Sequence, residues 1–185
     1  MFMSKSLVVG TMFSFIVTVA ALAQSNLGKP GTPNLGTPIT SNDVTAWDIS
    51  IEPDGEGLPP GSGTAKQAVG LYHERCSYCH GEGLEGKPAD RLVGGQGTLA
   101  APGAVKTVGS YWPYATTLFD FIRRAMPLNE PQSLTNDQVY ALSAFILYKN
   151  GIIGEKTKLD AKSLPKVKMP NRDGFFTVYP GNLKN

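Results

Sequence analysis

The sequence predicts an all-α domain of three main helices, flanked by long irregular N- and C-terminal extensions. Two capping boxes support the helices, since in each a threonine stands three residues before a glutamine at the start of an apolar periodic stretch. The two boxes are Thr64 with Gln67 and Thr135 with Gln138. Glycine (21 residues) and proline (14 residues) make up about a fifth of the 185 residues, which indicates long irregular segments outside the helices.

Four segments follow one another along the chain. Residues 1–23 are typical of a secretory signal peptide, with Lys5 before an apolar core and Ala21-Leu22-Ala23 as a cleavage site. An uncleaved membrane anchor is the alternative, but the apolar run is interrupted and short for a spanning helix. Residues 24–63 form a Pro- and Gly-rich arm, residues 64–151 the helical domain and residues 152–185 a C-terminal extension. We therefore expect a mature chain in the periplasm without a transmembrane segment.

The three helices have recognisable limits. The first begins at Thr64 and continues with apolar residues at helical spacing. The second spans about Thr117 to Ala125 and stops before Pro127, because the residue before a proline is driven out of the helical region. The third follows the capping box at Thr135, and Gly151 is placed to end it in a Schellman motif.

The arm differs from the domain in charge and in composition. From Gln24 to Gly63 it has one basic and five acidic residues. The net charge of the whole chain is only +2, so the composition indicates no basic surface for binding nucleic acid. The arm also contains Trp47, which we expect to be buried against something. The segment around Val44 to Pro60 is therefore interpreted either as a docking element for a partner protein or as a strap on this protein's own surface.

A haem-attachment site is indicated by the run Cys76-Ser77-Tyr78-Cys79-His80, because Cys-x-x-Cys-His is the attachment pattern of a c-type haem. Two thiols on one turn can bond the two vinyl groups along one porphyrin edge, and the imidazole of His80 then ligates the iron. A thioredoxin-like redox pair and half a zinc site are the alternatives. Against them, the sequence has only two cysteines and no βαβ pattern around the motif. We predict one covalently attached haem c, and we expect His73, the other histidine, on the surface.

Met126 is predicted to be the sixth ligand of the iron. Pro127 holds it in an extended conformation, and a methionine opposite a histidine raises the reduction potential. Once the signal is removed, Met169 is the other remaining methionine, but it lies in a charged tail. The alternative for Met126 is that it only fills the core.

The Gly-rich residues 81–115 separate the motif from the second helix. We expect Leu92 to Gly97 and Lys106 to Tyr114 to wrap the haem edge. Trp112 combines a large apolar ring system with one polar N–H group, so it either packs on the porphyrin or is an ordinary aromatic residue of the core.

Residues 64–151 resemble a class I cytochrome c in the order helix, Cys-x-x-Cys-His, Met-Pro and C-terminal helix. Tyr72 stands at the family's aromatic position before the first cysteine, and Ala144-Phe145 resembles the aromatic motif of its last helix. In the family, a backbone carbonyl just before a Leu-x-Gly segment accepts a hydrogen bond from the proximal imidazole. The resemblance implies that the carbonyl of Asp90, before Leu92, has this role here.

A closer resemblance covers most of the mature chain. It is carried by Trp47-Asp48-Ile49, Gly57 to Gly63, Leu92 to Gly97, Lys106 to Ala115 and Met169 to Phe175. These segments are similar to the haem-bearing subunits of periplasmic molybdenum sulfite dehydrogenases and of the sulfane dehydrogenase of the Sox system. The larger Sox subunit has a second haem, whereas this chain has one attachment motif.

The resemblance implies an electron-transfer protein without substrate chemistry of its own. Its electron donor would be a molybdenum sulfite dehydrogenase-type subunit, and its acceptor another cytochrome or a terminal oxidase. The alternatives are a haem enzyme, either peroxidase-like or thiosulfate-oxidising, and a haem sensor of small gases. Both alternatives need an exchangeable sixth ligand.

Overall fold

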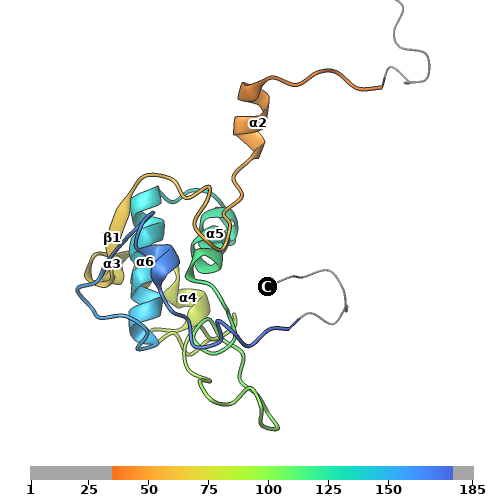
Figure 1. Cartoon of the computed structure of the whole chain (residues 1–185). Coiled ribbons are helices and arrows are strands. Elements are labelled where there is room, and N and C mark those ends of the chain that lie inside the picture. Colours follow the sequence, from red (N-terminus) through yellow and green to blue (C-terminus); the bar gives the residue numbers. More distant parts are fainter. Residues whose placement is uncertain (1–34, 177–185) are drawn as a thin grey trace, which may run out of the picture. The chain divides into compact units, whose positions relative to one another are not determined.

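The structure is a computed structural model and describes residues 35–176. The predicted signal peptide lies outside the described residues. The chain divides into two units, residues 1–45 and 46–185, and the second contains the helical domain. The elements in chain order are α2 (Ser41–Trp47), β1 (Ser62–Thr64), α3 (Ala65–Arg75), α4 (Ser77–His80), α5 (Ala115–Ala125), α6 (Asn136–Lys149), β2 (Lys158–Asp160) and a 3₁₀ helix, η1 (Leu164–Lys166) (Figure 1).

Helix α6 is the centre of the domain and packs against α3, α5 and β1 (Figure 1). Its residues from Val139 to Leu147 are all buried, as expected for a helix that is covered on more than one side. The predicted capping box is present, with the Gln138 amide donating to Thr135 Oγ1. The predicted Schellman motif closes the other end, because the Ile152 amide donates to the Leu147 carbonyl at 3.0 Å.

Helices α3 and α5 also follow the sequence pattern. Thr64 caps α3, and its capping box with Gln67 is formed. Helix α5 ends at Ala125 as predicted but begins two residues earlier than predicted, at Ala115. The first turn of α5 buries Ala115 and Thr116 in the core, so packing extends the helix beyond its local signal.

A two-stranded sheet corrects the expectation of an all-α fold. Strand β1 pairs antiparallel with β2, with Gly63 opposite Leu159, so the C-terminal segment adds a strand beside α6. A Cβ atom at Gly63 would collide with the backbone of Ala141 in α6. Glycine therefore permits the strand to approach the helix closely. Leu159, Leu164 and Met169 of the C-terminal segment are fully buried in the same core as the helices.

The arm has more structure than the sequence indicates. Residues 41–47 form the short helix α2, and the segment after it is bonded to the domain. Arg124 donates to the Ile49 carbonyl at 2.9 Å, and Tyr140 donates to the Pro59 carbonyl at 2.9 Å. Trp47 does not pack on this protein's own surface, since its side chain is 88% exposed. Its burial against a partner protein stays a prediction.

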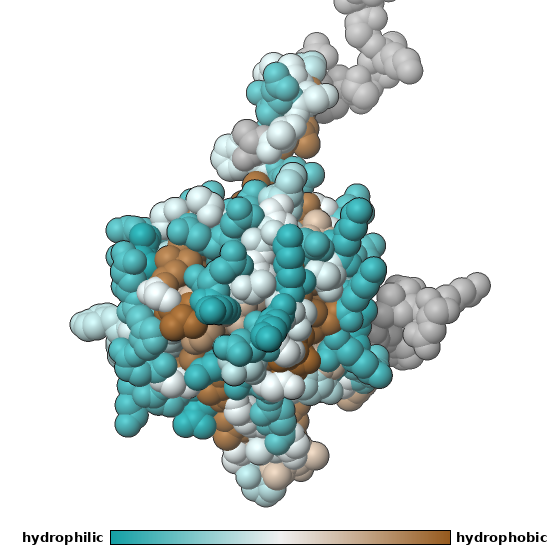
Figure 2. All heavy atoms as spheres, turned by 90° about the vertical axis from the view of Figure 1, so that its left-hand side faces the viewer, coloured by the Kyte–Doolittle hydropathy of each residue, from teal (hydrophilic) through white to brown (hydrophobic). Residues whose placement is uncertain are grey.

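The surface drawn in Figure 2 is mainly hydrophilic, and hydrophobic side chains form smaller separate patches between the polar ones. Among residues 35–176, no helix is both long enough and apolar enough to span a bilayer.

Candidate haem site

The two cysteines and the histidine lie at the corner between α3 and α4. Helix α4 is a single turn in which the amides of Cys79 and His80 both donate to the Cys76 carbonyl, at 3.1 and 3.0 Å. The turn therefore brings two thiols and one imidazole together on a short, internally bonded segment. Cys76 is half-buried and Cys79 is exposed. Burial raises the pKa of the Cys76 thiol to about 11, so this thiol is neutral at pH 7.

The imidazole of His80 is held by the backbone carbonyl that the family resemblance implies. Its Nδ1 atom lies 2.8 Å from the carbonyl oxygen of Asp90. A carbonyl can only accept, so Nδ1 carries the proton and the lone pair is left on Nε2. This is the tautomer that a metal-binding histidine requires. The Ala89 amide also donates to the Cys79 carbonyl at 2.9 Å, which fixes the loop that supplies Asp90.

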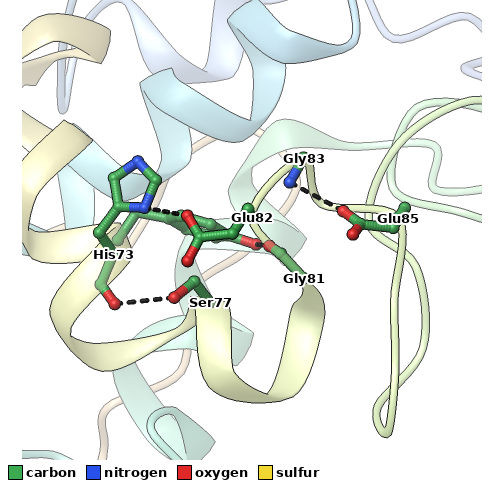
Figure 3. A network of polar contacts seen from close by, with 7 residues as sticks. His73, Ser77, Gly81, Glu82, Gly83 and Glu85 are labelled. Carbon is green, nitrogen blue, oxygen red and sulfur yellow. Dashed lines mark hydrogen bonds and ion pairs between the residues drawn. The ribbon is translucent and has the colours of Figure 1, made fainter.

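Side chains brace the corner between the two helices (Figure 3). Ser77 Oγ donates to the His73 carbonyl at 2.8 Å, and His73 pairs through Nδ1 with Glu82. Tyr72 is buried, and its hydroxyl donates to the Gly81 carbonyl at 2.8 Å. Burial raises the pKa of Tyr72, with smaller contributions of the same sign from nearby Cys76, Glu85 and Glu82. The side chain of His73 is 48% exposed, which confirms its predicted surface position.

Met126 terminates α5 in the predicted conformation. Its φ of −119° and ψ of 144° are extended, while its amide still donates to the Ile122 carbonyl at 3.1 Å. The side chain is partly exposed and packs against the domain core. Met169, the competing methionine, is only 1% exposed and lies inside that core. A thioether that still has an open side is the better candidate for ligation, so the structure favours Met126.

The other predicted haem contacts fall into two groups. Tyr72 and Phe145 are core residues, and their ring centroids lie 5.0 Å apart. Leu92 and Trp112 are partly exposed and pack against the same core, and Trp112 also makes an edge-to-face contact with Phe121 at 5.7 Å. Partly exposed apolar side chains, two thiols and an imidazole with a free Nε2 suit a flat apolar group bound through iron. The residues therefore fit a haem.

Two polar clusters near the site were not anticipated from the sequence. Asn150, at the end of α6, donates through Nδ2 to the Leu92 carbonyl at 3.1 Å and accepts at Oδ1 from the Gly94 amide at 3.1 Å. Arg75, which precedes Cys76, pairs with Glu130 at 2.6 Å. These partners are about 55 residues apart in each case, and no local pattern joins residues so far apart.

No three histidine, cysteine, aspartate or glutamate side chains gather as a metal-ion site in the part of the chain that the structure describes.

Comparison with known proteins gives two matches. Residues 63–146 match the family described as cytochrome C oxidase, cbb3-type, subunit III. The fold is also similar to a chain in the crystal structure of the sulfane dehydrogenase SoxCD from Paracoccus pantotrophus, with 39% sequence identity and a TM-score of 0.74. That match covers 82% of this chain and 73% of the SoxCD chain. No curated protein matches.

The chain belongs to the c-type cytochromes. Its family implies a haem and an electron-transfer role, in agreement with the Cys-x-x-Cys-His turn. Among solved structures it is similar to a chain of a sulfane dehydrogenase, as the resemblance of several sequence segments predicted.

Proposed function

We propose that this chain is a periplasmic cytochrome with one covalently attached haem c. It passes single electrons from a molybdenum enzyme of the sulfite dehydrogenase type to another cytochrome or to a terminal oxidase. The observation that carries the proposal is the Nδ1 contact of His80 with the Asp90 carbonyl, because it leaves Nε2 available on the same turn as the two cysteines.

The chain's own residues would hold the haem through covalent links, iron ligands and apolar contacts. The sulfur atoms of Cys76 and Cys79 would form the two thioether links, and His80 Nε2 would ligate the iron. The sulfur of Met126 would be the second protein ligand of the iron. Leu92 and Trp112 would pack on the porphyrin, and Tyr72 and Phe145 would support it from the core. When bound, the haem supplies a ferric/ferrous one-electron couple whose potential a methionine ligand raises. If His80 and Met126 both bind the iron, these residues would leave it no open position for oxygen or peroxide.

The assignment of a sulfur-oxidising donor is supported by the similarity to a chain of the sulfane dehydrogenase SoxCD. The match covers 82% of this chain, which is more than the predicted signal peptide leaves room for outside the arm (residues 24–63), so it extends into the arm. An enzyme–cytochrome complex of the same type therefore accounts for both the domain and part of the arm. This chain would be the non-catalytic subunit of such a complex.

The test of the ligand set is optical. The ferric protein should show the weak near-infrared sulfur-to-iron band, and Met126→Ala should abolish that band while leaving the haem attached. Met169→Ala is the matched control and should keep the band. Loss of the band in Met169→Ala instead would contradict the assignment. A change of the ferrous spectrum on adding carbon monoxide to the unmodified protein would favour the haem-enzyme alternative.

Partner and location need separate tests. A pull-down from periplasm should recover a molybdenum protein, and that protein should reduce the cytochrome when supplied with sulfite or another sulfur compound.

Mass spectrometry of the periplasmic form should give a chain that begins at Gln24 and carries one haem. A chain that retains residues 1–23 would indicate an uncleaved anchor.

A further inference from the structure

One arginine supplies side-chain hydrogen bonds from the rest of the domain to the segment that follows Met126. Arg75 Nη2 donates to Glu130 Oε2 at 2.6 Å and to Ser133 Oγ at 3.0 Å. Within the described residues, these are the side-chain hydrogen bonds that connect residues 127–133 to another segment. The contact lies at the surface, where the side chains of Arg75 and Glu130 are 29% and 54% exposed.

Both ends of this contact lie next to the proposed haem-binding residues. Arg75 is the last residue of α3 and directly precedes Cys76. On the other side, the Glu130 amide donates to the Pro127 carbonyl at 2.9 Å, which forms a turn immediately after Met126. The ion pair therefore spans from the attachment motif to the turn that follows the methionine.

We propose that Arg75 is a positioning residue that, through Glu130 and Ser133, holds the Met126 segment against the haem-attachment segment. This inference rests on the proposed role of Met126 as an iron ligand. Arginine suits the task because each terminal guanidinium nitrogen carries two N–H donors in a fixed plane, and here Nη2 donates to both acceptors. Without this tie, Met126 would keep only its backbone bond to α5 and its packing, so an external ligand would displace it more easily.

The experiment is a titration of the ferric holoprotein with imidazole, followed by loss of the near-infrared band. Arg75→Gln and Glu130→Gln should each raise the affinity for imidazole about two- to fivefold, as expected for a partly exposed ion pair. The double variant should bind imidazole no more tightly than Arg75→Gln alone, because the two residues act through one contact. Arg75→Lys should recover part of the effect.

The matched control is Asp120→Asn, which breaks the Asp120–Arg124 pair inside α5 without touching the contact between the two segments. Its imidazole affinity should equal that of the unmodified protein. Equal affinities in Arg75→Gln, Asp120→Asn and the unmodified protein would overturn the positioning role. If Arg75→Gln fails to incorporate haem, Glu130→Gln decides, since it lies outside the attachment motif. A missing band in the unmodified protein would instead overturn the proposed ligand set.

Discussion

The two sides of the proposed haem site are held in different ways. On the histidine side, the corner of α3 and α4 has backbone bonds from Cys79 and His80, side-chain bonds from Tyr72 and Ser77, and the contact of His80 with Asp90. The methionine side has the end of α5, one turn and the Arg75 ion pair. The histidine side is thus held by more hydrogen bonds of the polypeptide than the proposed methionine side. We expect the methionine to be the weaker of the two ligands.

The largest effect should come from removing the attachment of the haem. Cys76→Ala combined with Cys79→Ala should leave a largely unfolded chain, because the proposed haem would supply much of the apolar contact between the helices of a small core. Far-ultraviolet circular dichroism during a thermal melt measures this. A cooperative melt near that of the parent would show that hydrogen bonds of the histidine side and the existing core suffice without haem.

Met169→Ala should have the next largest effect, on stability alone. The side chain is fully buried, so truncation leaves a cavity and should lower the free energy of unfolding by about 2–5 kcal/mol. Denaturant titration of the holoprotein gives the value. A loss below about 1 kcal/mol would show that the C-terminal segment is not part of the cooperative core.

Tyr72→Phe sharpens the comparison on the histidine side. It removes the hydrogen bond to the Gly81 carbonyl but keeps the ring, and it should lower the free energy of unfolding by about 1 kcal/mol. Tyr148→Phe is the control, since Tyr148 lies at the surface. Equal stabilities of the two variants would mean that the corner does not need this brace.

A smaller effect is expected at alkaline pH from Tyr140, away from both sides of the site. Burial, and then nearby Asp160, raise its pKa to about 12, although Arg123 opposes them. The folded state therefore prefers the neutral phenol, and its stabilising contribution is complete below the ordinary pKa of about 10. The contribution is lost as the pH rises from there to about 12. Tyr140→Phe should make the melting temperature less sensitive to pH over this window, and an unchanged sensitivity would contradict the assignment.

The smallest effect on the domain itself is expected from the arm. Because residues from Ile49 onward are bonded to the domain, the informative deletion ends at Trp47 and removes residues 24–47. It should leave the haem spectrum and the melting temperature unchanged but slow reduction by the partner enzyme, since an exposed tryptophan beside acidic residues suits a docking element. The substitution Trp47→Ala should reproduce part of the slowing. Unchanged reduction kinetics in both variants would exclude the arm from docking.

Local patterns allowed much of the domain to be predicted. The capping boxes, the Schellman motif and the extended Met126 are each determined within a few residues of sequence, and all are present. The contact of His80 with Asp90 was implied by family resemblance and not by spacing. It could be identified because the motif around Leu92 is recognisable.

The errors concern features that depend on distant residues. Strand β2 pairs with β1 across almost a hundred residues, and a three-residue strand has no periodicity to recognise. Trp47 is not covered by this chain's own surface, and no local pattern distinguishes a tryptophan that packs on its own domain from one that packs on a partner. The tie between Arg75 and Glu130 likewise depends on tertiary structure alone.

Asn150 makes the last turn of α6 and the loop beyond the haem motif a single cooperative unit. Its side chain bonds to Leu92, Gly94 and Ile146 at once, and its carbonyl accepts from Gln96 at 3.0 Å. The loop can therefore become ordered only when the end of the helix has formed, and it opens when that end frays. In native-state hydrogen exchange, the amide of Gly94 should exchange at the rate of the closing turn of α6, although the two are separated by 56 residues.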